Sequence, residues 1–336
     1  MTVHGWPHCR RGRAIRERRF ANSPILVRAV GLGCNSLGSV IDTTQSEAVI
    51  RTALDEGINF FDTADIYGDG RSEEVLGKAL TGRRGEAVIA TKFGMPREDT
   101  PGSGGASRRF ILNAVDASLR RLRTDYIDLY QLHQPDPHIP IDETAGVLAD
   151  LVRQGKIRFI GVCNVSAEVL DVYRDALNRL RRGAFISVQV QYSLLRRGAE
   201  RELLPWCETH GLGLLPYFPL ASGLLTGKYR FGRRPPEGSR IARWGAAGER
   251  ILNSAEMKFI EQLGAWASQR QRSILELAIG WLLRCDAVPC VIAGATSPAQ
   301  VRANCAAADW VLAEGECLEL RARLEEHERA APASTS

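Results

Sequence analysis

The stretch INFFDTADIYGDGRSEEVLGKAL, residues 58–80, changes from an apolar run to a polar turn and then to a helical pattern. Its first four residues are mostly β-branched or aromatic and predict a buried parallel strand that ends at Asp62. A turn that contains Tyr67 follows, and a helix is expected near Ser72, with Ser72 as its N-cap and two acids in its first turn. The stretch therefore predicts one strand, one loop and one helix of a parallel α/β fold.

Asp62 and Tyr67 lie where parallel α/β folds keep their chemistry, at the carboxyl end of a strand and on the loop that follows it. A structural interpretation is about equally open on this stretch alone, with a solvated Asp and a Tyr that only packs. The motifs in the rest of the chain distinguish between the catalytic and the structural interpretation.

The same order of strand and helix repeats along the chain, after a short β-hairpin expected between residues 18 and 28. Strands are expected at residues 30–34, 58–62, 87–92, 126–132, 157–162, 185–190, 212–217 and 288–294. Helices are expected at residues 44–56, 166–180, 200–210, 255–269, 274–284 and 315–327. Three more are expected to begin near residues 72, 142 and 297, and another to end near residue 122. Residues 220–254 are expected to form a long loop.

Eight strands that alternate with helices predict an α/β fold of the single (β/α)8 TIM-barrel type, with the hairpin at its N-terminus. A doubly wound sheet is the competing fold, but Gly31-Leu32-Gly33 lacks the third glycine of a dinucleotide fingerprint and no acidic residue follows at the required distance. We expect one barrel domain over residues 18–328. Residues 1–17 are expected to be a disordered, Arg-rich extension and residues 329–336 a flexible tail.

The composition excludes several classes of protein. Hydrophobic residues make up 44% and charged residues 25% of the chain, as in globular proteins with a full core. The net charge is only +5, no Lys/Arg-rich segment is interleaved with aromatics, and no apolar run is long enough for a transmembrane helix, so neither nucleic acid nor membrane is an expected partner. The eight cysteines form no Cys-x-x-Cys motif and predict reduced thiols in a cytoplasmic protein. His4, His8 and Cys9 are weak metal candidates, and no metal is expected.

Four polar residues are expected at the carboxyl ends of neighbouring strands: Asp62, Tyr67, Lys92 and His133. This set suits a general acid, because Lys92 would lower the high pKa of the Tyr67 phenol and Asp62 would hold Lys92 charged. His133 would hydrogen-bond a substrate oxygen. Each residue alone has a structural explanation as a salt bridge, a core histidine or a packing tyrosine, but packing needs explain all four together poorly.

Seven segments carry a resemblance to the aldo-keto reductase superfamily over about residues 16 to 312. They are INFFDTADIYG (58–68), ATKFG (90–94), YIDLYQLHQPDP (126–137), GVCNVS (161–166), QVQYSLLRR (189–197), PYFPLASGLLTGKY (216–229) and IAGATSPAQVRAN (292–304). The resemblance implies a (β/α)8 barrel that reduces carbonyls to alcohols with NADPH, without metal or flavin. It also implies the catalytic roles of Asp62, Tyr67, Lys92 and His133, and the retained His133 favours reduction of C=O over C=C.

The resemblance further implies a set of cofactor-binding residues: Gly33, Cys163, Asn164, Gln189, Tyr217, Phe218, Pro219, Leu220, Ser222, Gly223, Leu224, Lys228, Gly294, Thr296, Ser297, Gln300 and Asn304. Asn164 and Gln189 would contact the nicotinamide carboxamide, and Tyr217 would stack on the nicotinamide ring. Residues 218–224 would surround the pyrophosphate and residues 294–304 the adenosine.

Three of these positions depart from the family's usual residues. Cys163 and Phe218 stand where serine is usual, so a serine contact to the carboxamide is missing at Cys163. Thr296 stands where many relatives carry an arginine that binds the 2′-phosphate, a role that Ser297 or Arg302 could take here. The expected cofactor is therefore NADPH, with NADH as the alternative.

Several functions stay open within and beyond the resemblance. The substrate is expected to be a small-molecule carbonyl, and the basic loop 220–254 makes a nucleotide-linked keto-deoxysugar an alternative to a simple aldehyde or ketone. A Schiff base on Lys92 would make the protein an aldolase or lyase, but this leaves the cofactor motifs unexplained. Potassium-channel β-subunits share the barrel and bind NADPH, so a regulatory subunit is another alternative. The protein is expected to be a monomer or a weak homo-oligomer.

Overall fold

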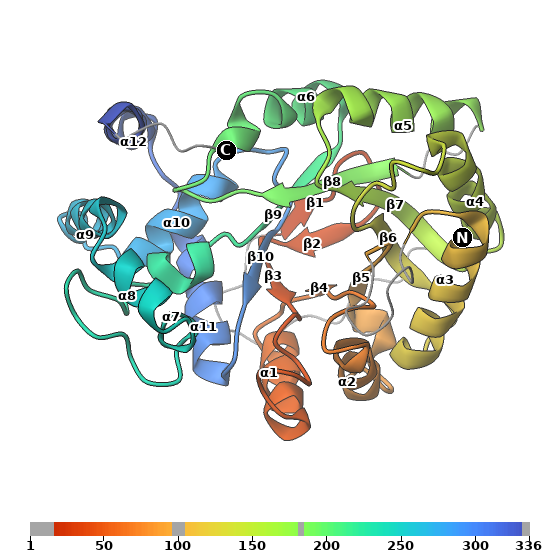
Figure 1. Ribbon diagram of the computed structural model, residues 1–336, viewed down its shortest axis with the longest axis horizontal. Coiled ribbons are helices and arrows are strands. Elements are labelled where there is room, and N and C mark those ends of the chain that lie inside the picture. Colours follow the sequence, from red (N-terminus) through yellow and green to blue (C-terminus); the bar gives the residue numbers. More distant parts are fainter. Residues whose placement is uncertain (1–16, 96–104, 181–184, 331–336) are drawn as a thin grey trace.

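The computed structural model describes residues 17–95, 105–180 and 185–330, and an eight-stranded parallel sheet lies at its centre (Figure 1). In spatial order the strands are β10 (Val291–Gly294), β3 (Val30–Gly33), β4 (Phe60–Asp62), β5 (Val88–Phe93), β6 (Ile127–Leu132), β7 (Ile157–Cys163), β8 (Phe185–Gln191) and β9 (Gly213–Tyr217). The sheet curls until its edges meet, where the Leu214 N–H donates to the Ala287 carbonyl at 2.7 Å. The predicted (β/α)8 barrel is confirmed.

Helices surround the sheet as expected for this fold (Figure 1). They are α1 (Thr43–Asp55), α2 (Arg71–Ala79), α3 (Arg108–Leu122), α4 (Ile141–Arg153), α5 (Ala167–Arg179), α6 (Leu203–His210), α7 (Arg240–Arg243), α8 (Ala246–Leu252), α9 (Ala255–Ser268), α10 (Ile274–Leu283), α11 (Pro298–Ala306) and α12 (Glu314–Ala330). No helix in the described ranges combines the length and apolarity that a membrane crossing needs.

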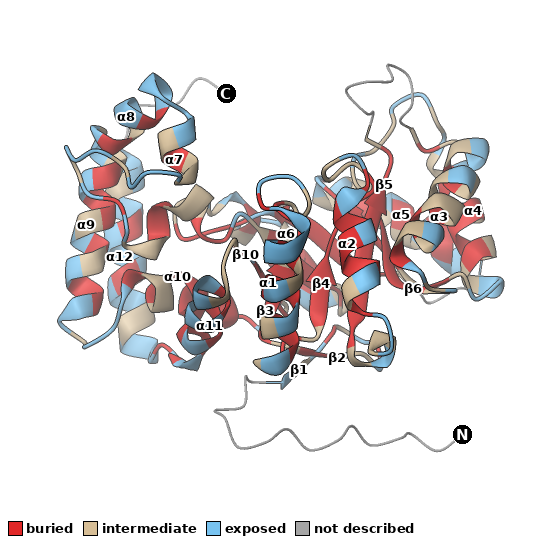
Figure 2. Ribbon diagram, turned by 90° about the horizontal axis from the view of Figure 1, so that it is seen from below, coloured by how far each residue is buried: buried red, intermediate tan, exposed pale blue. Residues whose placement is uncertain are grey.

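The N-terminal hairpin closes the bottom of the barrel, at the end opposite α7 and α8 (Figure 2). Its strands β1 (Glu17–Arg19) and β2 (Leu26–Arg28) pair antiparallel, and the predicted hairpin is confirmed. Phe20 is fully buried, with its ring centroid 5.8 Å from that of Phe60 in β4. The Arg18 guanidinium donates to the carbonyl of Leu283 at 3.0 Å, which fixes the hairpin to the end of α10.

The barrel interior below the strand ends is filled with apolar side chains. They form a cluster of their own: Phe20, Val27, Phe60, Val88, Ala90, Leu129, Ile186, Leu215, Cys290 and Ile292. Successive strand residues point to opposite faces, so Phe60 lies in this cluster while Phe61 packs against the helices. The lower interior is therefore dry, and polar chemistry is restricted to the carboxyl ends of the strands.

Two expected boundaries differ for physical reasons. Strand β10 begins at Val291, three residues later than expected, because Pro289 has no N–H to give to a sheet ladder. Helix α2 begins at Arg71 with Gly70 at the N-cap, so the prediction of Ser72 as N-cap was wrong. Gly70 has φ +87°, a conformation that glycine adopts without strain, and Ser72 instead donates its hydroxyl to the Cys34 carbonyl at 2.8 Å.

The segment 220–254 contains more regular structure than the expected loop, namely the 3-10 turns η3 (Ala221–Thr226) and the short helices α7 and α8. At the two ends, β1 already includes Glu17 and α12 continues to Ala330, two residues past the expected end of the domain. The expected disorder of residues 1–16 and flexibility of residues 331–336 lie outside the described residues. The proposed domain boundaries stay predictions.

Gly77 in α2 allows this helix to approach α3 closely. A Cβ at Gly77 would lie 2.5 Å from the Leu122 backbone carbon and 2.6 Å from the Arg121 carbonyl oxygen. The same contact is supported by the buried Glu73, which accepts a hydrogen bond from the Arg121 Nε at 2.7 Å. The spacing of α2 and α3 therefore leaves no room for a side chain at position 77.

We predict that Gly77→Ala lowers the free energy of unfolding by about 1–3 kcal/mol, because the backbone of α3 cannot move aside without repacking. Gly146→Ala in α4 is the matched control, since a Cβ there meets no atom within 4 Å. Its higher helix propensity should leave stability unchanged or raise it by about 0.5–1 kcal/mol. Urea unfolding measures both variants, and equal effects of the two would contradict the packing argument.

Candidate active site

The ammonium group of Lys92 is the centre of the site. It donates to Asp62 Oδ2 at 2.7 Å, to the Thr63 carbonyl at 2.8 Å and to the Tyr67 hydroxyl at 3.2 Å. An ammonium has three protons, so these acceptors fill its capacity. The side chain of Lys92 is fully buried, at the end of β5 and next to β4, which ends at Asp62. Because β4 and β5 are neighbours in the sheet, Asp62, Tyr67 and Lys92 lie together, and these are three of the four catalytic residues predicted from the sequence.

Asp62 is fixed by more than this ion pair. Its second carboxylate oxygen, Oδ1, accepts from Gln189 Nε2 at 2.9 Å and from Gln131 Nε2 at 3.3 Å. The contacts of Gln131 and Gln189 with Asp62 were not predicted from the sequence, in which Gln131 was not singled out and Gln189 was assigned to the nicotinamide carboxamide. The missed signal was present in the strand pattern, because Gln131 precedes His133 by two residues and therefore faces the same side of β6.

Burial raises the pKa of the Tyr67 phenol above its ordinary value, and the charge of Lys92 only partly opposes this effect. The prediction that the pKa of Tyr67 is lowered was therefore wrong. The Lys92 ammonium does act to lower this pKa, but burial raises it by more. Burial alone would lower the pKa of Lys92, but the charges of Asp62 and Tyr67 raise it above its ordinary value. At neutral pH the phenol thus keeps its proton beside a charged ammonium.

His133 lies next to Tyr67, with the two ring centroids 6.0 Å apart and the rings nearly perpendicular at 81°. Burial, assisted by the charge of Lys92, lowers the pKa of His133 to about 3. The imidazole is therefore neutral at physiological pH and carries a single N–H. Its Nδ1 is buried and has no hydrogen-bond partner among the described residues.

The residues predicted to contact nicotinamide adjoin His133. Asn164 donates from Nδ2 to the His133 carbonyl at 3.1 Å and accepts from the Tyr217 hydroxyl at 3.0 Å. Cys163 is buried at the end of β7, and burial raises the pKa of its thiol to about 12, so it is a neutral group here. Gln189 donates from Nε2 to Asp62 Oδ1, and its predicted contact with the nicotinamide carboxamide stays a prediction.

The turn after β9 has four residues with positive φ: Phe218 (+50°), Ala221 (+46°), Ser222 (+58°) and Gly223 (+95°). Left-handed residues next to right-handed ones turn successive N–H groups toward one side, which makes a concave site for anions. In this turn the N–H groups of Ala221 and Gly223 donate to the carbonyls of Phe218 and Leu220 at 2.9 Å, and the role of the stretch in binding pyrophosphate stays a prediction.

Two cations border this turn. Lys228 Nζ would lie 3.4 Å from a Cβ placed on Gly223, so its ammonium is at the turn itself. The Arg240 guanidinium lies 5.7 Å from the centroid of the Phe218 ring, and burial together with the charge of Arg243 lowers its pKa. A partly buried cation near a second cation would be stabilised by a bound anion.

The predicted adenosine-binding residues lie at the start of α11. Ser297 caps this helix and accepts from the Gln300 N–H at 3.4 Å, as the sequence predicted. The N–H and hydroxyl of Thr296 both donate to Gln300 Oε1, at 2.8 and 3.2 Å. Asn304 Nδ2 donates to the carbonyl of Gly294, which is paired in register with Gly33 of β3. These residues form one group at the mouth of the barrel.

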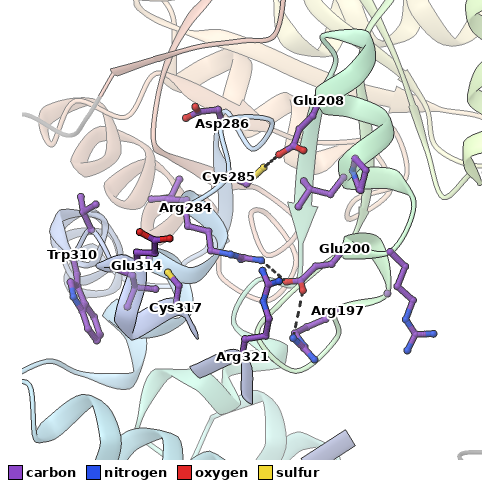
Figure 3. Close-up of a pocket in the computed structure, with 18 of the residues that line it drawn as sticks. Arg197, Glu200, Glu208, Arg284, Cys285, Asp286, Trp310, Glu314, Cys317 and Arg321 are labelled. Carbon is purple, nitrogen blue, oxygen red and sulfur yellow. Dashed lines mark hydrogen bonds and ion pairs between the residues drawn. The ribbon is translucent and has the colours of Figure 1, made fainter. Parts of the chain in front are cut away.

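A cavity of about 840 Å³ lies elsewhere, between α6, α10 and α12 (Figure 3). None of the predicted site residues lines it. Its charges neutralise one another, since Glu200 pairs with Arg284 at 2.9 Å and Arg197 pairs with Glu328 at 2.9 Å. No group of three or more potential metal ligands occurs in the described part of the chain, and the weak candidates His4, His8 and Cys9 lie outside it.

Known proteins are similar to this chain over most of its length. The model of the Aldo/keto reductase family matches residues 29–325. The chain is 35% identical over 304 residues to aldo-keto reductase YhdN of Bacillus subtilis (strain 168), covering 87% of this chain and 88% of that protein. It is 34% identical over 282 residues to a probable voltage-gated potassium channel subunit beta of Oryza sativa subsp. japonica, with 82% and 85% covered.

Among solved structures, the chain is similar to the holo form of aldo-keto reductase AKR11C1 from Bacillus halodurans, with a TM-score of 0.75 and 35% sequence identity. This similarity covers 92% of this chain and 96% of that one. The resemblance inferred from seven sequence motifs is confirmed, and the chain belongs to the aldo/keto reductase family.

Proposed function

We propose that this protein reduces an aldehyde or ketone to an alcohol with NADPH, and that Tyr67 donates the proton. Membership of the family supports nicotinamide-dependent carbonyl reduction in general. The observation that carries the proposal is the position of the Tyr67 hydroxyl, 3.2 Å from the Lys92 ammonium, which is itself held by Asp62 at 2.7 Å.

The residues present fit a nicotinamide dinucleotide. When bound, it would supply the hydride. Asn164 and Tyr217 would hold its nicotinamide, and the left-handed turn at 218–224 with Lys228 and Arg240 would hold its phosphates. Gly33, Gly294, Thr296, Ser297, Gln300 and Asn304 would surround the adenosine end. NADH remains the alternative cofactor, because Thr296 offers no positive charge to a 2′-phosphate.

Tyr67 acts as an acid because burial keeps its phenol protonated at neutral pH. When the proton leaves for the substrate oxygen, the phenolate that remains is stabilised by the ammonium of Lys92. Asp62 keeps this ammonium charged and directed at the phenol. The neutral imidazole of His133 donates its N–H to the substrate oxygen and orients the carbonyl between itself and Tyr67.

The basic loop 220–254 supports a cofactor role for its arginines more than a substrate role. Arg230 donates to the Gly227 carbonyl at 2.8 Å and Arg243 to the Gly238 carbonyl at 2.8 Å, so both brace the loop itself. Arg240 lies at the Phe218 turn. A simple aldehyde or ketone is therefore favoured over an anionic, nucleotide-linked keto-deoxysugar.

A regulatory subunit is the second candidate, favoured by the 34% identity to a probable channel subunit beta. Retention of all four predicted catalytic residues in one contacting group favours turnover over regulation. A cytoplasmic location and a monomeric or weakly homo-oligomeric state remain predictions from the sequence.

We predict that Tyr67→Phe lowers kcat for carbonyl reduction by about 10²–10⁴-fold, the usual contribution of a general acid. NADPH binding, measured by fluorescence, should stay close to wild type because the aromatic ring remains. Tyr126→Phe is the matched control, since Tyr126 stacks between Arg84 and Arg158 away from the site. An equal loss of binding and turnover in Tyr67→Phe would contradict the acid role.

We predict that Thr296→Arg raises the preference for NADPH over NADH, because a guanidinium would pair with the 2′-phosphate at the start of α11. The ratio of the two kcat/KM values should rise about tenfold or more, as expected for a charge-assisted hydrogen bond. Thr209→Arg on the exposed face of α6 controls for added charge. An unchanged ratio in Thr296→Arg would place the 2′-phosphate elsewhere.

A further inference from the structure

Two glutamines from different strands hold the same oxygen of Asp62. Gln131 of β6 and Gln189 of β8 both donate to Oδ1, at 3.3 and 2.9 Å, while Oδ2 is taken by Lys92. Gln131 is fully buried, and Gln189 and Asp62 are each 3% exposed. The orientation of the Asp62 carboxylate thus depends on two amide donors, and only one of them, Gln189, has a predicted role in cofactor binding.

The residues around Gln131 leave space for its side-chain amide. Gln131 is paired in register with Gly161 of β7, and Gly161 with Ser187 of β8. A Cβ on Gly161 would lie 3.0 Å from Gln131 Cγ and would clash with the Ser187 hydroxyl oxygen. Glycine at position 161 therefore leaves the space that the Gln131 side chain occupies.

This amide is a poor choice for packing alone. Gln131 Oε1 is buried and has no hydrogen-bond partner within the described ranges, which is an energetic cost for the folded protein. An apolar side chain of similar size would fill the same space without that cost. What the amide adds is its N–H bond to Asp62.

The two glutamines differ in what else they can bind. If the protein is the reductase proposed above, Gln189 lies in the position from which the family contacts the nicotinamide carboxamide, so its amide would be shared between Asp62 and the cofactor. Gln131 lies on β6 and has no such second partner. Gln131 would then be the donor to Oδ1 that serves Asp62 alone during the reaction.

We propose that Gln131 is a positioning residue that fixes the Asp62 carboxylate, and through it the Lys92–Tyr67 pair, when the cofactor is bound. Without this donor the carboxylate is held only by Lys92 and by the shared amide of Gln189, and it turns more easily about its Cβ–Cγ bond. The Lys92 ammonium then loses its fixed direction toward the Tyr67 hydroxyl. Proton donation slows, whereas the residues that bind the cofactor are untouched.

The test compares Gln131→Met, which keeps the volume and removes the donor, with Tyr130→Phe, a neighbour on the other face of β6. The Tyr130 hydroxyl is also buried and has no partner among the described residues, so its removal controls for loss of a buried polar group on this strand. The measurements are kcat and KM for carbonyl reduction, the solvent deuterium isotope effect, the NADPH Kd and the Tm. Gln131→Asn, whose amide is too short to reach Asp62, is a second variant that tests the same donor in a smaller side chain.

The proposal predicts that kcat falls about ten- to a hundredfold in both Gln131 variants, the loss expected for a hydrogen bond to a charged group. The isotope effect should increase because proton transfer limits the rate more strongly, while the NADPH Kd stays near wild type. Gln131→Met should change Tm by no more than about 3 °C. Tyr130→Phe should match wild type in kcat.

Three results would overturn the proposal in distinguishable ways. Wild-type turnover that both Gln131 variants preserve would remove the positioning role and leave the proposed reductase function intact. A wild-type protein that binds NADPH but reduces no carbonyl would remove the reductase function and this role with it. A fall in kcat that is matched by an equal loss of NADPH affinity would show a general structural role instead.

Discussion

The buried ion pair between Lys92 and Asp62 is the constraint on which the site depends. A fully buried ammonium and a carboxylate with 3% exposure are expensive to remove from water unless every polar atom finds a partner. The protein meets this demand with the Thr63 carbonyl and the Tyr67 hydroxyl on the lysine and two amides on the aspartate. The hydrogen bonds that satisfy the charges also place the phenol.

The same pair sets the protonation states of its neighbours. Burial and the Lys92 charge hold the pKa of His133 at about 3, so His133 is a neutral donor and not a second cation. Burial keeps the proton on Tyr67, and the Lys92 charge only partly opposes this effect. In the proposed mechanism, the acid and the orienting hydrogen-bond donor thus both depend on the Lys92 charge and on burial.

Much of this could be predicted from the sequence, because short apolar runs and the polar residues that end them are local patterns. The eight strands and the clustering of Asp62, Tyr67 and Lys92 follow from such patterns. The sign of the Tyr67 pKa shift could not be predicted, because it depends on how far burial outweighs the Lys92 charge. Gln131 was missed for a related reason, since its value lies in a contact with Asp62, 69 residues away in the chain.

The central claim is that Lys92 acts on catalysis through Tyr67, and a double-mutant cycle tests it directly. The rate of carbonyl reduction is measured for wild type, Lys92→Met, Tyr67→Phe and the double variant, each checked for folding and NADPH binding. The account predicts that both single variants lose most of the activity and that the double variant is hardly worse than Tyr67→Phe. Losses that simply multiply would show independent roles and contradict it.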